Sequence, residues 1–149
     1  MSHQKSMHEL SHAVYKLSRI MVDFFQRRIE LEGIDDLHPS VGLILLPLLK
    51  REGRTPSELA KDLHMKAPTI TVIANRLEDR GWIRRERGTT DRRQVHLYLT
   101  KEGREKAELF DDVRKKVLQQ MAAGVNRESI GLVNDTLKRI IRNVHGGVA

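Results

Sequence analysis

Apolar residues recur every three or four positions near the start of the chain, which is the spacing of an amphipathic helix. In residues 10–25 this stripe consists of Leu10, Val14, Leu17, Met21 and Phe24, with Ile20 and Phe25 beside it. We expect Gly33 and the aspartates that follow it to end this helix. A second helix is predicted over residues 39–53, where the internal Pro47 should cause a kink or a missing backbone hydrogen bond.

The middle of the chain contains the clearest helix start. Residues 55–58 read TPSE, which places a hydroxyl at the N-cap and a glutamate three positions later, the pattern of a capping box. The helix that follows, over residues 56–63, should bury Leu59, Ala60 and Leu63. Another helix is predicted over residues 68–81, with a buried side formed by Ile70, Ile73, Ala74 and Leu77. Two short helices joined by a tight turn form a helix-turn-helix.

From Trp82 the period changes from that of a helix to that of a strand. Residues 82–87 and 94–99 are predicted strands, and the loop 88–93 gives their hairpin a basic tip. We expect Trp82 to pack where helix meets strand rather than to line a pocket. Thr100 and Asn126 should cap two further helices. Their apolar stripes comprise Phe110, Val113, Val117 and Met121 in the first, and Ile130, Val133, Leu137, Ile140, Ile141 and Val144 in the second.

These elements predict a mainly α-helical fold with a small β-hairpin wing, that is, a winged helix-turn-helix over residues 37–100. The apolar stripes of the terminal helices need burial, and too little chain remains to form a second core. We therefore expect residues 1–34 and 108–149 to form the dimerisation region of a two-fold homodimer.

The composition excludes several classes of protein. The 149 residues include no cysteine, which excludes disulfide frameworks and thiolate metal sites. The longest strongly apolar run, residues 41–49, is shorter than the roughly 20 residues that a membrane helix needs. The N-terminal sequence lacks the apolar region of a secretory signal, so we expect a cytoplasmic protein with no membrane partner. Aromatic residues make up only 4%, which disfavours binding of single strands by base stacking.

The net charge of +7 is concentrated in the middle of the chain. Residues 50–93 hold 12 basic and 7 acidic side chains, whereas residues 1–49 hold 5 and 6, and residues 94–149 hold 10 and 7. A polyanion is the partner that such a segment favours, although a solubilising surface could have the same charge.

The outer side of the predicted helix 68–81 and the tip of the hairpin hold the candidate binding residues. Such a helix enters the major groove of DNA, and arginines on a hairpin can enter a narrow minor groove. The helix candidates are Lys66, Pro68, Thr69, Thr71, Val72, Asn75 and Arg76, and the hairpin candidates are Arg87, Asp91, Arg92 and Arg93. We expect the Asp91 carboxylate to hold the Arg93 guanidinium in place before DNA binds. The alternative is an exposed ion pair without function.

Residues 55–100 resemble the winged helix-turn-helix of the MarR family of bacterial regulators. The resemblance rests on ELAKDLHM, TITVIANRLEDRGWIRRE and DRRQVHLYLT, and the order and length of the helices extend it over almost the whole chain. It implies a dimeric protein that binds an inverted-repeat operator in double-stranded DNA, usually as a repressor. Release by a small aromatic or anionic ligand is common in the family.

The resemblance also implies roles for individual residues. Arg93 matches the wing arginine that reaches the minor groove, Asp91 matches its anchoring partner, and Thr69, Thr71 and Val72 match positions of the recognition helix. Two departures are expected to alter the half-site that is read. Lys66 stands where the family commonly has a serine cap, and Val72 stands where arginine or another polar residue is frequent.

Other functions are less favoured by the sequence. It contains no GxSxG, HExxH or phosphate-cradling loop, so we expect no enzyme activity and no cofactor. A winged-helix module that binds RNA or a protein is the alternative. His8 and His12 lie four positions apart, but the nearby sequence offers no strong third ligand, so we expect no metal site. Arg19 and His38 are the candidates for lining an effector cavity.

Overall fold

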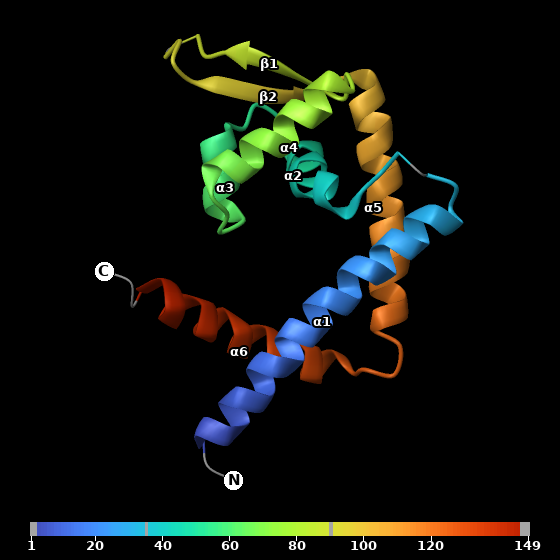
Figure 1. Ribbon diagram of the computed structural model, residues 1–149, viewed down its shortest axis with the longest axis vertical. Helices are drawn as coiled ribbons and strands as arrows, with labels where there is room; N and C mark the ends of the chain where they lie inside the picture. The colour runs from blue at the N-terminus through green and yellow to red at the C-terminus, as the bar shows by residue number, and fades with distance from the viewer. Residues whose placement is uncertain (1–2, 35, 90, 147–149) are drawn as a thin grey trace. The chain divides into compact units, whose positions relative to one another are not determined.

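The computed structural model describes residues 3–34, 36–89 and 91–146. The chain divides into two compact units, Met1–Val117 and Leu118–Ala149. Figure 1 shows the elements of the chain in order, and they are α1 (His3–Leu31), η1 (Pro39–Val41), α2 (Gly42–Lys50), α3 (Pro56–Asp62), α4 (Ala67–Asp79), β1 (Ile83–Arg87), β2 (Val95–Leu99), α5 (Lys101–Met121) and α6 (Arg127–Gly146). The prediction of a mainly helical fold with a two-stranded hairpin is confirmed.

The second predicted helix differs from the observed one at both ends. It begins as the 3-10 turn η1, and α2 ends at Lys50 instead of residue 53. The reason is that the next residues join the sheet: the Gly53 N–H donates to the Leu97 carbonyl at 2.9 Å, and the Leu97 N–H donates to the Arg54 carbonyl at 2.9 Å. Gly53 has φ of +71°, which a glycine adopts without strain. Pro47 lies inside α2 and has no N–H to donate to the preceding turn.

The helix-turn-helix forms as the sequence predicts. The Thr55 hydroxyl accepts from the Glu58 N–H at 3.2 Å, and the Glu58 carboxylate accepts from the Thr55 N–H at 2.8 Å. This backbone hydrogen bond lowers the pKa of Glu58 below its ordinary value. The predicted buried side of α4 is confirmed. The prediction that Leu63 is buried is wrong, since it is only half-buried and lines a cleft described below.

The hairpin is one residue shorter at the start of each strand than predicted. The register pairs Ile83 with Leu99 and Arg87 with Val95. Trp82 stays outside β1 because its N–H donates to the Leu77 carbonyl at the end of α4, at 2.9 Å. Its side chain is only 3% exposed, which confirms the predicted packing role.

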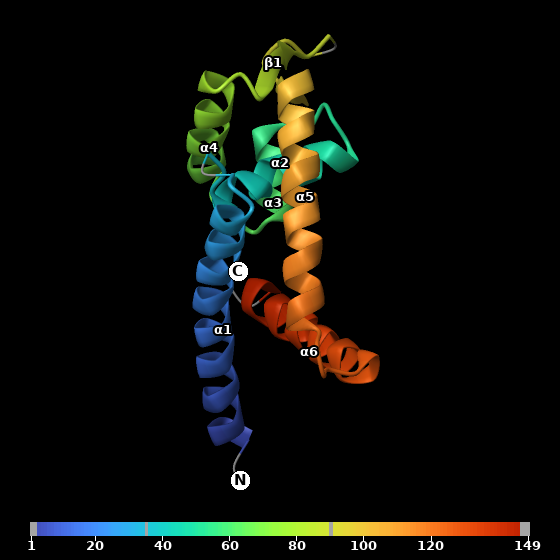
Figure 2. The same cartoon turned by 90° about the vertical axis from the view of Figure 1, so that its right-hand side faces the viewer.

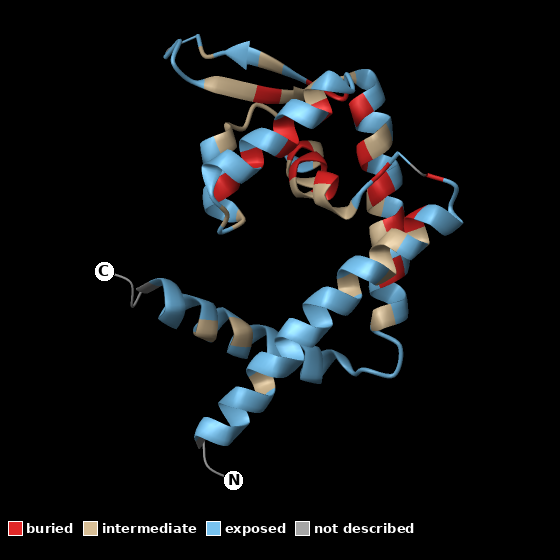
Figure 3. Ribbon diagram, in the orientation of Figure 1, coloured by how far each residue is buried: buried red, intermediate tan, exposed pale blue. Residues whose placement is uncertain are grey.

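The N-terminal end of α5 holds the base of the hairpin. The Thr100 side chain caps α5 by accepting from the Gly103 N–H at 3.0 Å, and the Thr100 N–H donates to the Trp82 carbonyl at 3.0 Å. Figure 2 shows α5 running from the hairpin past α2. The buried residues of this unit lie mainly on α2, the inner side of α4, the base of the hairpin and one side of α5 from Gly103 to Val117 (Figure 3). Because α4 and the hairpin pack on this shared core, the core sets the position of the outer side of α4 relative to the hairpin.

The second unit consists of the end of α5, a turn and α6. Asn126 caps α6 by accepting from the Ser129 N–H at 2.8 Å, as predicted. Several apolar side chains of this unit are exposed, namely Leu118, Val125, Ile130, Leu132, Val133, Ile141 and Val144. Among the helices that the structure describes, none combines the length and the apolar character that crossing a bilayer requires.

Candidate nucleic-acid interface

The outer side of α4 is exposed from the N-cap of the helix to Arg76. All seven helix candidates from the sequence are exposed there. Val72 is 49% exposed. The Thr71 hydroxyl donates to the Ala67 carbonyl at 3.0 Å, so towards a ligand it can only accept. Lys66 occupies the N-cap without any side-chain capping bond, which leaves its ammonium group to the surface.

The hairpin tip is shaped by Asp91, but not in the predicted way. Its carboxylate accepts from the backbone N–H of Arg93 at 2.9 Å. Among the described ion pairs, none joins this carboxylate to the Arg93 guanidinium, so the predicted contact is corrected. The physical reason is that a short aspartate reaches the backbone two residues later more easily than the end of an arginine. Asp91 therefore fixes the turn, and Arg93 projects from it as an exposed side chain.

The arginines of the hairpin fall into two groups. Arg84 pairs with Glu86, and its guanidinium lies 4.8 Å from the centre of the Tyr98 ring. Arg85 contacts α4, as described below. The remaining arginines, Arg87, Arg92 and Arg93, are exposed, and within the described residues none of them has a side-chain hydrogen bond or an ion pair. Their positive charge is therefore available to an anionic partner.

Arg85 connects the hairpin to α4, a contact that the sequence analysis missed. Its guanidinium donates to the Asn75 side-chain oxygen at 2.5 Å and pairs with Glu78 at 2.9 Å. Asn75 and Glu78 lie three positions apart and so share one side of α4. No local pattern marks this contact, because the partners are separated by a helix end and a turn. The Asn75 oxygen thus already accepts a hydrogen bond, and contact of Asn75 with DNA stays a prediction.

The predicted effector residues Arg19 and His38 do not meet in one cavity. His38 caps η1, where its ring nitrogen accepts from the Ser40 N–H at 3.2 Å. It borders a small cavity of about 130 Å³ that Arg76 and Arg80 also line. Arg19 lines neither this cavity nor the cleft between α1, α2 and α5. A role of Arg19 and His38 at an effector site stays a prediction.

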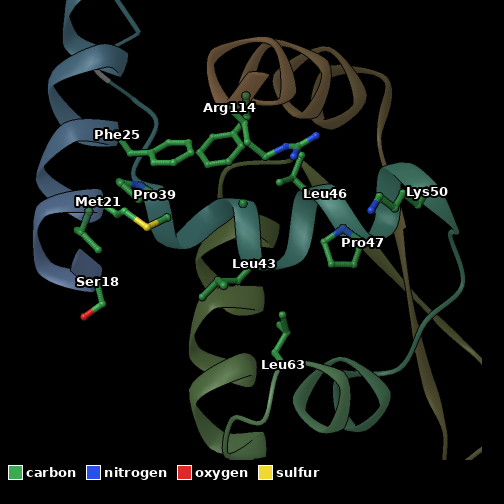
Figure 4. A pocket seen from close by; sticks show the side chains of 13 residues that line it. Ser18, Met21, Phe25, Pro39, Leu43, Leu46, Pro47, Lys50, Leu63 and Arg114 are labelled. Carbon is green, nitrogen blue, oxygen red and sulfur yellow. The ribbon is translucent and has the colours of Figure 1, made fainter. Parts of the chain in front are cut away.

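A cleft of about 590 Å³ lies between α1, α2 and α5. Figure 4 shows its mostly apolar wall, with Met21, Phe25, Leu43, Leu46 and Leu63 among the side chains that face it. Two cations, Lys50 and Arg114, stand at its edge. Arg114 donates from two nitrogens to one oxygen of Asp111, at 2.8 and 2.6 Å. The pKa of Asp111 is lowered, first by a hydrogen bond from Lys115 and then by that from Arg114.

The histidine pair on α1 carries no metal-site geometry. His8 and His12 are both exposed. No group of three or more histidine, aspartate or glutamate side chains suited to a metal ion occurs in the part of the chain that the structure describes.

Comparisons with known proteins identify the family of this arrangement. The family model described as "MarR family" matches residues 38–95, which span α2 to the start of the second strand. The chain is 32% identical to the organic hydroperoxide resistance transcriptional regulator of Bacillus subtilis over 68% of this chain and 67% of that protein. It is 36% identical to the transcriptional repressor MprA of Escherichia coli over 53% of this chain and 44% of that repressor.

Solved structures share the fold over nearly the full chain. The Streptococcus pneumoniae protein FabT, in complex with DNA, has a TM-score of 0.67 and 26% identity, and the match covers 97% of this chain and 99% of FabT. The chain spans 32% of the length of one curated relative that it matches and 44% of another. The relative matched over two thirds of its length, together with the family model and the fold, shows that this chain belongs to the MarR family of transcriptional regulators.

Proposed function

We propose that the chain is a sequence-specific regulator that binds double-stranded DNA, acting as a homodimeric repressor at an inverted-repeat operator. One observation carries the proposal: the same compact unit presents the exposed outer side of α4 and a hairpin whose Arg87, Arg92 and Arg93 are exposed and have no ion pair with any other described residue. The major groove, about 12 Å wide, admits an α-helix such as α4. The hairpin arginines would then meet the narrow minor groove next to it, where the negative potential is strongest.

The homodimer is supported by the exposed apolar side chains at both ends of the chain. On α1 they include Val14, Leu17 and Ile20, each between 41% and 52% exposed. On α6, Ile130, Val133, Ile141 and Val144 are between 45% and 60% exposed. Side chains of this size at helical spacing are normally buried, and a second copy of the chain is the partner that residues 1–34 and 108–149 would pack against. Two α4 helices about 34 to 36 Å apart would reach successive major grooves.

The names of relatives agree with this function. MprA of Escherichia coli and MdtR of Bacillus subtilis are both called repressors, and FabT was solved in complex with DNA. Each name belongs to the relative, and repression by this chain is our proposal.

An effector is the second part of the proposal, and the cleft between α1, α2 and α5 is where it would bind. The wall is apolar, and Lys50 lies at the edge with no ion pair among the residues described. This combination suits a small aromatic or amphipathic anion. Because α1 carries both part of the cleft wall and exposed apolar side chains of the proposed dimer interface, a bound ligand would change the spacing of the two α4 helices and so lower the affinity for DNA.

The experiment that tests the proposal is selection of bound fragments from random duplex DNA. We expect enrichment of an inverted repeat with half-sites about one helical turn apart. Enrichment of RNA in a parallel pool, or no enrichment of any duplex, would favour the alternative of an RNA- or protein-binding module.

Replacing Arg93 with alanine tests the role of the hairpin in the same assay. Loss of one arginine contact in each half of the dimer should weaken operator binding about 10- to 100-fold while the protein stays folded. The matched control is Arg84→Ala, because Arg84 lies on the same hairpin but is already paired with Glu86. Equal effects of the two variants would remove the hairpin tip from the binding site.

A further inference from the structure

We infer that Arg85 holds Asn75 as a hydrogen-bond donor, so that Asn75 reads acceptor atoms of the DNA bases and does not bind the amino group of adenine or cytosine. This inference rests on the proposed function. It makes Arg85 a positioning residue that acts through Asn75, and it assigns to Asn75 a polarity that the sequence alone does not fix.

The contact between the hairpin and α4 is built from two bonds. Arg85 Nη2 donates to Asn75 Oδ1 at 2.5 Å, and Arg85 Nη1 lies 2.9 Å from Glu78 Oε2. The Arg85 side chain is only 29% exposed, so the surrounding chain also restricts it. A planar guanidinium held at two points has little freedom to turn away. The position of the Asn75 side chain is therefore set by the hairpin.

The chemistry of arginine decides which end of the Asn75 side chain faces it. A guanidinium only donates hydrogen bonds, so the atom that it contacts must be the amide oxygen. The amide nitrogen, with its two N–H groups, is then left for other partners. Within the described residues, no hydrogen bond from this nitrogen to the rest of the chain is found, and Asn75 lies on the exposed side of α4.

This orientation limits which bases Asn75 can read. The usual asparagine contact to adenine needs both ends of the amide: the oxygen accepts from the N6 amino group while the nitrogen donates to N7. Here the oxygen already accepts from a charged donor, and a base amino group would have to approach the same guanidinium. Guanine O6 and N7 and thymine O4 accept hydrogen bonds, so they match the free N–H groups.

The carboxylate of Glu78 helps to hold Arg85, and through it the orientation of the Asn75 amide. Glu78 pairs with Arg85, which keeps the guanidinium from turning towards a DNA phosphate. Arg84, one position earlier in β1, pairs with Glu86 and lies over Tyr98 instead. The two adjacent arginines therefore face different partners, and only Arg85 can set the polarity of Asn75.

The test uses the full chain and the duplex found by selection from random DNA. The base pair read by Asn75 is the one whose preference disappears in Asn75→Ala. Every base pair carries a single amino group in the major groove, adenine N6 or cytosine N4. Duplexes lacking that group, made with purine for adenine or 2-pyrimidinone for cytosine, are compared with the normal duplex for the wild type and for Asn75→Ala.

The inference predicts that removing the amino group changes wild-type affinity by the same factor as in Asn75→Ala, because no bond to that group exists. In Arg85→Met the oxygen is free, and removing the amino group should cost about fivefold more than in Asn75→Ala, the value of one hydrogen bond. In Asn75→Asp the carboxylate has two acceptor oxygens, of which one can pair with Arg85 and the other can accept from the base amino group. A similar extra loss of affinity is therefore expected when the amino group is removed. Arg84→Met is the matched control and should behave like the wild type.

Three results would overturn the inference. One is a wild-type loss about fivefold greater than that of Asn75→Ala when the amino group is removed. Another is Arg85→Met remaining as insensitive as the wild type. The third is Asn75→Ala with unaltered base preferences. A wild type that enriches no duplex at all would instead refute the proposed function, so the two failures are distinguishable.

Discussion

Replacing Gly103 with alanine should destabilise the protein, against the usual effect of this change in a helix. Gly103 lies in the first turn of α5, directly against the backbone of Trp82. A Cβ added to Gly103 would lie 1.7 Å from the Trp82 carbonyl oxygen and 2.6 Å from the carbonyl carbon. Real Cβ contacts are essentially never shorter than 3.0 Å, so α5 and the base of the hairpin have to separate.

The expected magnitude follows from three terms. Overpacking a tight site costs about 1–3 kcal/mol. The Trp82 carbonyl also accepts from the Thr100 N–H at 3.0 Å, and weakening this bond costs about 1 kcal/mol. The higher helix propensity of alanine offsets about 1 kcal/mol. The net loss in the free energy of unfolding is about 1–3 kcal/mol, and at about 2–4 °C for each kcal/mol in a chain of this length Tm should fall by about 2–12 °C.

The assay is urea unfolding of Gly103→Ala beside Gly131→Ala. An added Cβ at Gly131, inside α6, meets nothing within 4 Å. The control should therefore be neutral or stabilised by up to about 1 kcal/mol. Because the hairpin begins at this contact, operator binding by Gly103→Ala should fall as well. A Gly103→Ala variant as stable as Gly131→Ala would show that α5 and Trp82 do not pack in this way.

Three further predictions concern the cap and the dimer. Glu58→Ala should lower the free energy of unfolding by about 1 kcal/mol in urea titrations, because the Thr55 N–H loses its partner; an unchanged midpoint would argue against the capping box. The Thr55 N–H also lowers the pKa of Glu58, so this stabilisation is present above the ordinary glutamate pKa and is lost as the pH falls through the folded-state value. The stability difference between wild type and Glu58→Gln should shrink on acidification, and a constant difference would contradict the shift. Replacing Leu137 and Ile141 together by aspartate should give monomers or unfolded chain in sedimentation, whereas Asn134→Asp should stay dimeric; a full-affinity dimer of the double variant would refute the interface.

Features that depend on neighbouring residues could be predicted from the sequence. The TPSE pattern predicts the capping box directly, because both residues that form it lie within four positions of sequence. The buried side of α4 follows from its helical spacing, and Thr100 and Asn126 cap the helices that they precede. Charge placement likewise indicated the hairpin as the basic part of the chain.

Contacts between distant or competing partners could not be predicted. The Asp91 carboxylate can accept a hydrogen bond either from the guanidinium of Arg93 or from its backbone N–H. The sequence does not show which of the two bonds forms, and the structure shows the bond to the backbone. The pairing of Gly53 with Leu97 ends the second helix early, yet it depends on where β2 lies in space. Arg85 meets α4 only after the chain has turned at Gly81, so its role appears in no local spacing.

The central claim is that two copies of this chain bind duplex DNA through α4 and cationic hairpins, and the salt dependence of binding tests it most directly. Affinity for the selected inverted repeat is measured over a range of salt concentrations, beside an RNA duplex of the same sequence. The account predicts one dimer for each site, a fall in log affinity of about 0.9 per neutralised phosphate for each unit of log salt, and a shallower slope for Arg93→Ala. Affinity that does not vary with salt, or equal binding to the RNA duplex, would contradict it.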